Sequence, residues 1–335
     1  MTYTPGIEIV IMARDRPEYL RKAMDAIEKI DFGVPAHLVI SNNSATCAPL
    51  IDVDETKWEI RNREQNLDPH THFAYIVAES KFEWSCITHD DDELLPHFGK
   101  LFRNYHANSE VRFISGLSSI VNLSVDSSAN VGYQNRIARS GITEELQYRC
   151  SDFLLAQFKV GSLLPFSAIA VRTEYLCIPN NETGFAGDYY FAMAICSRKV
   201  SRVESSLVYD SLNPIMNYNL HEEQDSQNTR MRYEMPILSA ICRFQILDKN
   251  RELVEDISFL KLILQSLYGI RLAKIGGGTS RKCIVDFERL FIASTLFQRR
   301  SALKFLLFRI GPYAVGMTSL ADLANKIKWK IRSFA

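Results

Sequence analysis

The chain has 335 residues, of which 47% are hydrophobic and 23% charged, and its formal net charge at pH 7 is zero. This composition excludes an intrinsically disordered chain, and the neutral balance gives no general attraction to nucleic acid. The length allows two domains, or one large domain with an appendage. The charge is uneven, because residues 299–335 hold eight Lys or Arg and one Asp, a local charge of +7.

Alternating strands and helices are predicted over the first hundred residues. The β-branched run at residues 7–12 predicts a buried first strand, and apolar residues at helical spacing follow across residues 18–30. Further strands are predicted at 37–40, 58–60 and 84–87, with a helix at 73–80. This β-α-β alternation predicts a mainly parallel, doubly wound sheet with right-handed crossovers.

The rest of the chain divides into a polar middle and a helical end. Residues 124–150 carry no strong pattern, and residues 213–227 are polar and irregular. After about residue 230 the spacing of apolar residues becomes helical. We therefore expect an α/β domain over residues 1–227 and a helical C-terminal region over residues 228–335. Additional strands are predicted at 111–115, 118–123 and 200–209. Residues 166–171 form another apolar run, and residues 184–191 lead into a predicted helix that extends through 195.

The seven cysteines are scattered and contain no Cys-x-x-Cys pair. This pattern favours reduced thiols over a disulfide framework or a zinc site. The N-terminus lacks the pattern of a signal peptide, and no apolar run is long enough to predict a spanning helix. We therefore expect a cytoplasmic protein, or one attached to the inner face of the cytoplasmic membrane.

Three consecutive aspartates, Asp90, Asp91 and Asp92, follow the strand predicted at 84–87. Adjacent carboxylates repel one another, and folding them beside a buried strand is costly unless a cation or hydrogen-bond donors compensate. Hard oxygen ligands spaced in this way suit Mg²⁺ or Mn²⁺, ions that commonly hold substrate phosphates. A solvated acidic turn that caps the next helix is the alternative.

Polar segments end three of the predicted strands, at residues 13–15, 41–43 and 90–92. In a parallel sheet these ends lie along one edge, which is where open α/β sheets bind their ligands. Taken in order, the segments resemble the GT-A glycosyltransferases of the inverting family-2 type, over roughly residues 7–227. The matching stretches are 12–16, 41–44, 61–62 with 66–67, the Asp-x-Asp context of 89–96, Gly187-Asp188, and His221.

The resemblance implies a GT-A fold, Rossmann-like with a mainly parallel central sheet and a C-terminal helical extension, and a role for each matching residue. Asp92, or Asp91 because the register is ambiguous, and His221 would bind Mn²⁺ or Mg²⁺. Asp188 would be the general base, with a helix N-cap as its structural alternative. The donor nucleotide-sugar would contact Ala13, Arg14, Asp15, Asn42, Arg61, Asp90 and Asp91.

The sequence departs from the family pattern at three positions. Asp68 stands where the family usually has glycine, and Gly187 where it often has glutamate, which puts the acceptor contacts in doubt. Asn42 stands where aspartate is common. Its amide oxygen still accepts a hydrogen bond from a pyrimidine N3–H, so uracil or thymine binding survives the change.

Residues 299–335 combine apolar residues at helical spacing with flanking cations and one tryptophan. This pattern suits an anionic membrane surface, and the alternative is a helical appendage packed on the catalytic domain. Co-sedimentation with liposomes, with and without these residues, distinguishes the two. If the membrane interpretation holds, the family analogy suggests a lipid-linked saccharide acceptor, as in bacterial surface-polysaccharide (O-antigen) assembly.

The sequence therefore predicts a metal-dependent, inverting glycosyltransferase that uses a nucleotide-diphosphate sugar. A sugar-phosphate nucleotidyltransferase is the nearest enzymatic alternative, but the segment at 12–16 lacks the glycines of its phosphate loop. A non-catalytic protein that binds nucleotide-sugars as a scaffold is the alternative from another class.

Overall fold

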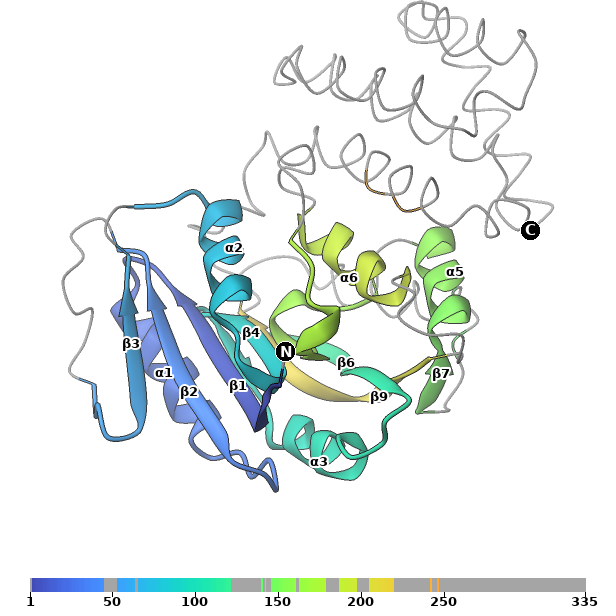
Figure 1. Ribbon diagram of the computed structural model, residues 1–335, viewed down its shortest axis with the longest axis horizontal. Helices are drawn as coiled ribbons and strands as arrows, with labels where there is room; N and C mark the ends of the chain where they lie inside the picture. The colour runs from blue at the N-terminus through green and yellow to red at the C-terminus, as the bar shows by residue number, and fades with distance from the viewer. Residues whose placement is uncertain are drawn as a thin grey trace, which may run out of the picture. The chain divides into compact units, whose positions relative to one another are not determined.

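The computed structural model, shown in Figure 1, describes the N-terminal two-thirds of the chain with gaps. Residues 1–180 with 191–221 form one compact unit, and residues 181–190 with 222–335 form a second. The predicted boundary at residue 227 stays a prediction. The described residues are 2–44, 53–63, 66–121, 140, 142, 146–160, 163–178, 187–197, 205–219, 242 and 246.

Four parallel strands form one half of a nine-stranded sheet, in the order β3-β2-β1-β4. In Figure 1 they lie side by side in blue to cyan. Met12 pairs with Ser41 on one side and with His89 on the other, so three strands end at the same level. The predicted parallel, doubly wound arrangement is confirmed here. The bounds are β1 (Thr4–Ala13), β2 (Ala36–Asn42), β3 (Trp58–Asn62) and β4 (Phe82–His89).

The other half of the sheet is mixed. It continues from β4 in the order β8-β6-β9-β5, with β7 also paired to β9. The β6–β9 pairing is parallel, and the remaining pairings in this half are antiparallel. The bounds are β5 (Asp92–Leu94), β6 (Val111–Val121), β7 (Gln147–Arg149), β8 (Ala170–Arg172) and β9 (Ser206–Asn219).

Helices flank the sheet, and α1 carries the amphipathic pattern expected of a surface helix. The buried residues of α1 are Leu20, Ala23, Met24 and Ile27, which recur at helical spacing. Helix α2 begins four residues before the predicted start, because Asp68 caps it and Pro69 fits its first turn. The bounds are α1 (Pro17–Ile27), α2 (Pro69–Glu79), α3 (Pro96–Tyr105), α5 (Cys150–Val160), α6 (Gly187–Ser197), and the 3₁₀ turns η1 (Phe166–Ala168) and η2 (Thr173–Tyr175).

One hydrophobic cluster joins α1 and α3 to a face of the sheet. Trp84 on β4 meets Phe102 on α3 edge to face, with ring centroids 5.4 Å apart, and Phe32 packs against Phe98 and Phe102. Isoleucines 7, 9 and 11 of β1 belong to the same cluster. This packing fixes the strands whose ends carry the predicted site.

The structure differs from the predicted elements in three places. The two strands predicted at 111–115 and 118–123 are one strand, β6. Residues 213–219, predicted to be irregular, continue β9. A short strand that was not predicted, β5, precedes α3 and pairs Asp92 with Tyr218 of β9.

The predicted helical C-terminal region lies almost wholly outside the described residues. Of residues 228–335 the structure describes 242 and 246, and the basic stretch at 299–335 is not among them. In the part of the chain that is described, no helix is long and apolar enough to cross a membrane.

Candidate metal and nucleotide-sugar site

The carboxyl ends of β2, β1 and β4 are held together by backbone hydrogen bonds. The N–H of Asn43 donates to the carbonyl of Ala13 at 2.9 Å, and the N–H of Asp90 donates to the carbonyl of Met12 at 3.3 Å. The three polar segments expected at one sheet edge are therefore adjacent. Polar groups at this edge of a parallel sheet are well placed to bind a ligand.

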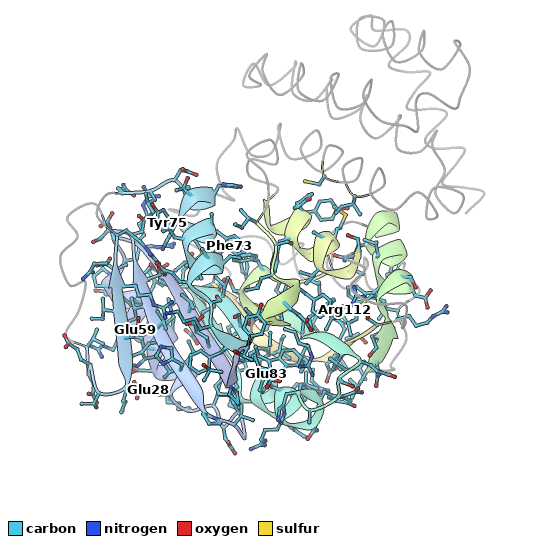
Figure 2. The ribbon with its side chains drawn as sticks, viewed as in Figure 1. Glu28, Glu59, Phe73, Tyr75, Glu83 and Arg112 are labelled. Atoms are coloured by element: carbon cyan, nitrogen blue, oxygen red, sulfur yellow. The ribbon has the colours of Figure 1, made fainter. Side chains whose placement is uncertain are left out.

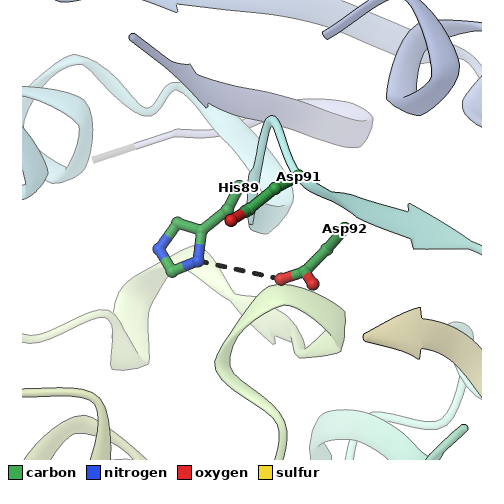
Figure 3. A group of neighbouring side chains, drawn as sticks. All are labelled: His89, Asp91 and Asp92. Carbon is green, nitrogen blue, oxygen red and sulfur yellow. Dashed lines mark ion pairs between the residues drawn. The ribbon is translucent and has the colours of Figure 1, made fainter. Parts of the chain in front are cut away.

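His89, Asp91 and Asp92 form a group that could hold a metal ion, as Figure 3 shows. One potential ligand atom of each lies within 4.8 Å of the others. The His89 Nδ1 atom is 3.7 Å from Asp92 Oδ2. The His89 ring also stacks on Phe166, which limits how far it turns away from the carboxylates.

Asp92 is buried with one carboxylate oxygen unpartnered. Its Oδ2 atom accepts a hydrogen bond from the hydroxyl of Ser167, while Oδ1 has no hydrogen-bond partner in the part of the chain that is described. Burial raises the pKa of Asp92 to about 7, against an opposing effect of His89. An unpaired buried carboxylate oxygen is costly, so this atom fits a bound cation.

A side chain that the sequence interpretation did not single out, Arg16, bridges the other two aspartates. Its Nη2 atom donates to Asp90 Oδ1, and its Nη1 atom donates to Asp91 Oδ2 at 2.7 Å. The second oxygen of Asp90 accepts from the backbone N–H of Arg14 at 2.8 Å. Burial raises the pKa of Asp90, and the charge of Arg16 opposes that rise. Asp90 is thus held within the protein, whereas Asp91 is shared between Arg16 and the metal-binding group.

The end of β2 presents buried amides. The Asn42 amide nitrogen donates to Asn62 Oδ1 at 2.8 Å, and its oxygen accepts from the Ser44 N–H at 3.1 Å. Asn43 exchanges two hydrogen bonds with the backbone of Leu67. These bonds fix the orientation of both amides, which is what recognition of a planar base requires.

Beneath these amides lies a buried cluster of Ser41, Arg63 and His72. Arg63 donates from Nε and Nη2 to the Ser41 hydroxyl oxygen, and this hydroxyl is 2.7 Å from His72 Nε2. Burial lowers the pKa of His72 to about 4, assisted by the charge of Arg63. His72 is therefore neutral at pH 7.

Arg61 belongs to an ion-pair network on β3 rather than to the metal-binding group. It pairs with the buried Glu8 at 2.8 Å and with Glu59 at 2.7 Å. Figure 2 labels Glu59 on β3, and Tyr75 on α2, whose ring lies under Arg63. The predicted contact of Arg61 with the donor stays a prediction, since Glu8 and Glu59 already bind its guanidinium.

The remaining predicted residues lie in different surroundings. Arg14 and Asp15 are exposed beside the site, and Ala13 is buried at the end of β1. Asp188 is the second residue of α6. Its role as general base is untested, and His221 lies outside the described residues.

Three groups at the site were given no role by the sequence interpretation: Arg16, Ser167 and His89. A signal existed for Arg16, which directly precedes the helix that follows the first strand, and for His89, which adjoins the aspartates. Ser167 lies 75 residues from Asp92 in the sequence, and nothing in its neighbourhood predicts the contact.

Comparisons with known proteins establish the fold but no family. No protein-family model matches the chain, and no curated protein matches it. Among solved structures, S. aureus TarS 1-349 in complex with UDP-GlcNAc is 12% identical, with 91% of this chain and 87% of that chain covered and a TM-score of 0.52. The mannosyltransferase PcManGT from Pyrobaculum calidifontis, in complex with GDP-Man and Mn²⁺, is 11% identical, with 96% and 88% covered and a TM-score of 0.44.

The similarity to TarS shows that the chain has an α/β fold of the GT-A type, with a central, mostly parallel sheet. This confirms the predicted fold class over the described residues. At 12% identity the similarity extends to the fold alone, so the chemistry must be argued from the residues of this chain.

Proposed function

We propose that this protein is a metal-dependent, inverting glycosyltransferase that transfers a sugar from a nucleotide-diphosphate donor to a saccharide acceptor in polysaccharide biosynthesis. The observation that carries the proposal is the group of His89, Asp91 and Asp92 at the ligand-binding edge of a GT-A sheet. The buried, unpartnered Oδ1 of Asp92 supports a cation there. The donor class is supported by the UDP-GlcNAc that TarS binds in the same fold.

On the donor side, Asp91 and Asp92 would hold Mn²⁺ or Mg²⁺, with His89 beside them and the predicted ligand His221 completing the shell. When bound, the cation would stabilise the negative charge that develops on the departing nucleoside diphosphate. Asp90, fixed by Arg14 and Arg16, would face the ribose. The amide of Asn42 would face the base.

On the acceptor side, Asp188 would take the proton of the attacking hydroxyl as its oxygen bonds to the anomeric carbon and the bond to the diphosphate breaks. In-line attack of this kind inverts the configuration at the anomeric carbon, and it needs a carboxylate on the acceptor side. A lipid-linked acceptor, and a location in the cytoplasm or on the inner face of its membrane, stay predictions that depend on residues 299–335.

The direct test measures release of nucleoside diphosphate from a panel of nucleotide-sugars with and without Mn²⁺. We expect Mn²⁺-dependent release, lowered by about 100-fold or more in Asp188→Asn and in Asp92→Ala. A thermal-shift measurement separates the roles, because Asp188→Asn should keep Mn²⁺-dependent donor binding and Asp92→Ala should lose it. Asp25→Asn removes an exposed carboxylate of α1 and is the matched control.

Four outcomes contradict parts of this proposal. Undiminished release by Asp188→Asn would remove the general-base assignment. Formation of UTP from a UDP-sugar and pyrophosphate would identify a nucleotidyltransferase instead. Binding of no nucleotide-sugar at all would contradict the donor class, and binding without any reaction would favour a scaffold protein.

A further inference from the structure

Arg16 contacts the acidic cluster from the junction of β1 and α1. Its guanidinium forms a fork, with one nitrogen on Asp90 and the other on Asp91. The side chain is 23% exposed, whereas the carboxylates of Asp90 and Asp91 are 0% and 7% exposed. The Arg16 side chain is therefore more exposed to solvent than the two carboxylates that it contacts.

The two carboxylates that Arg16 joins have different surroundings. Asp90 uses both of its oxygens inside the protein, because Oδ2 accepts from the backbone of Arg14 and Oδ1 accepts from Arg16. Asp91 gives its Oδ2 atom to Arg16 and is also a member of the group with His89 and Asp92. A cation that binds Asp91 must therefore share this carboxylate with a guanidinium that carries the same sign of charge.

Charge balance shows what this sharing implies. Three carboxylates and one guanidinium leave a charge of −2, which a divalent cation neutralises. A nucleotide-sugar then brings a diphosphate of about −2, and the cation alone no longer balances the site. An arginine that leaves Asp91 does not change this total, but it moves its positive charge from Asp91 to the diphosphate, and its planar fork suits phosphate oxygens as well as carboxylates.

We propose that Arg16 competes with the divalent cation for Asp91 and that the donor's diphosphate relieves this competition by drawing the guanidinium away from Asp91. Asp90 keeps its hydrogen bond from the backbone N–H of Arg14 and stays in contact with Arg16 while the Arg16 guanidinium moves from Asp91 to the diphosphate. The inference rests on the proposed function, since it assigns a residue to the binding of its metal and its donor.

The consequence is a coupling between the two ligands. The cation binds weakly while Arg16 engages Asp91, and the nucleotide strengthens cation binding by giving Arg16 another anion. By thermodynamic linkage the cation strengthens nucleotide binding by the same factor. If Arg16 only held the loop in place, its removal should have the opposite effect on the affinity for the cation. Asp91 would then become less ordered, and the cation would bind more weakly.

The experiment measures the Kd of Mn²⁺ for the full chain by electron paramagnetic resonance of free Mn²⁺, with and without saturating UDP. We expect Arg16→Gln to bind Mn²⁺ about threefold or more tightly than the unaltered chain without UDP, because one competing charge is removed. The factor by which UDP tightens Mn²⁺ binding should fall about tenfold, and UDP at saturating Mn²⁺ should bind correspondingly more weakly.

Two further variants complete the design. Arg21→Gln removes the same charge from an exposed position on the helix that follows Arg16, α1, and should change the Mn²⁺ affinity less than about twofold. Arg16→Lys keeps the charge but replaces the planar fork with a compact ammonium that fits the two carboxylates less well, so its Mn²⁺ affinity should fall between those of the unaltered chain and Arg16→Gln. If Arg16→Gln does not fold, the Mn²⁺ affinity of Arg16→Lys tests the competition instead: tighter binding than in the unaltered chain supports it, and unchanged or weaker binding contradicts it.

Mn²⁺ binding by Arg16→Gln that is unchanged or weaker, with normal binding by the unaltered chain, would overturn the competition. An unchanged coupling factor would overturn the transfer to the diphosphate. Failure of the unaltered chain to bind Mn²⁺ would instead contradict the metal site of the proposed function, and the competition with it.

Discussion

At the scale of single residues, the buried cluster of Ser41, Arg63 and His72 has a defined protonation pattern. Arg63 has no acceptor atom, so both of its bonds to Ser41 are donated to the hydroxyl oxygen. The hydroxyl proton is then directed to His72 Nε2, which must accept it. His72 is therefore a neutral imidazole with its proton on Nδ1, and protonation of Nε2 would place two donors against each other.

Acid is expected to destabilise the protein through His72. The pKa in the folded chain is about 4 against an ordinary value of 6.5, so between these values the unfolded chain binds more protons. Stability is therefore lost as the pH falls from 6.5 to 4, by up to about 3 kcal/mol from this residue. The raised pKa of Asp92 acts with the opposite sign, because its folded form binds the extra proton as pH falls from about 7.

Comparison of the unaltered chain with His72→Gln isolates the contribution of His72 to the pH dependence of stability, because Asp92 is present in both proteins. Urea unfolding at pH 7 and at pH 4.5 should show a smaller loss of stability for His72→Gln than for the unaltered chain. Equal losses in both chains would contradict the neutral, buried state of His72.

Among single residues, the three aspartates of the site could be predicted from the sequence, whereas the side chains that bind them, Arg16 and Ser167, could not. Asp90, Asp91 and Asp92 are consecutive, so repulsion between them is visible before folding. Arg16 and Ser167 reach them through tertiary contacts across 74 and 75 positions. The sequence interpretation considered Arg14 and Arg61, because it could not distinguish an arginine with a local carboxylate from one aimed at the aspartates.

At the scale of elements, uninterrupted apolar strands were predictable and short or polar strands were not. β1 and β4 are mostly apolar along their buried lengths, although Glu8, Ser85 and Thr88 are buried as well, so their burial could be predicted from composition. β5 holds three residues, one of them Asp92, and exists because β9 pairs with it. β9 contains Asn213 and Pro214, which ordinarily end a strand, and the β6–β9 pairing shifts register at this point.

Helix α3 offers a test of how closely its packing is fixed. A Cβ atom on Gly99 would lie 2.7 Å from the backbone carbonyl oxygen of Asp31, which cannot move aside as a flexible side chain would. Alanine would favour a helix by about 1 kcal/mol, but overpacking of this kind costs about 1–3 kcal/mol or more. We therefore expect Gly99→Ala to lower the melting temperature.

Lys100→Ala, at the next and exposed position of α3, is the matched control and should leave the melting temperature nearly unchanged. A Gly99→Ala chain as stable as Lys100→Ala would contradict the close approach of α3 to the turn after α1.

At the scale of the whole molecule, the fold and the proposed chemistry rest on different evidence. The GT-A sheet is shown by the structure and by the similarity to TarS. The proposed metal and donor rest on the arrangement of His89, Asp91 and Asp92, and the proposed inverting mechanism rests on Asp188 as general base. The predicted partners Asp188 and His221, and the basic stretch at 299–335, come from the sequence resemblance and the charge pattern.

The central claim is that this arrangement holds a divalent cation against the donor's diphosphate. Crystals grown with Mn²⁺ and UDP, and measured at a wavelength where manganese scatters anomalously, test it most directly. The account predicts one anomalous peak at about 2.0–2.3 Å from carboxylate oxygens of Asp91 or Asp92, in contact with the diphosphate. UDP bound with no peak at these carboxylates, or with the peak elsewhere, would contradict it.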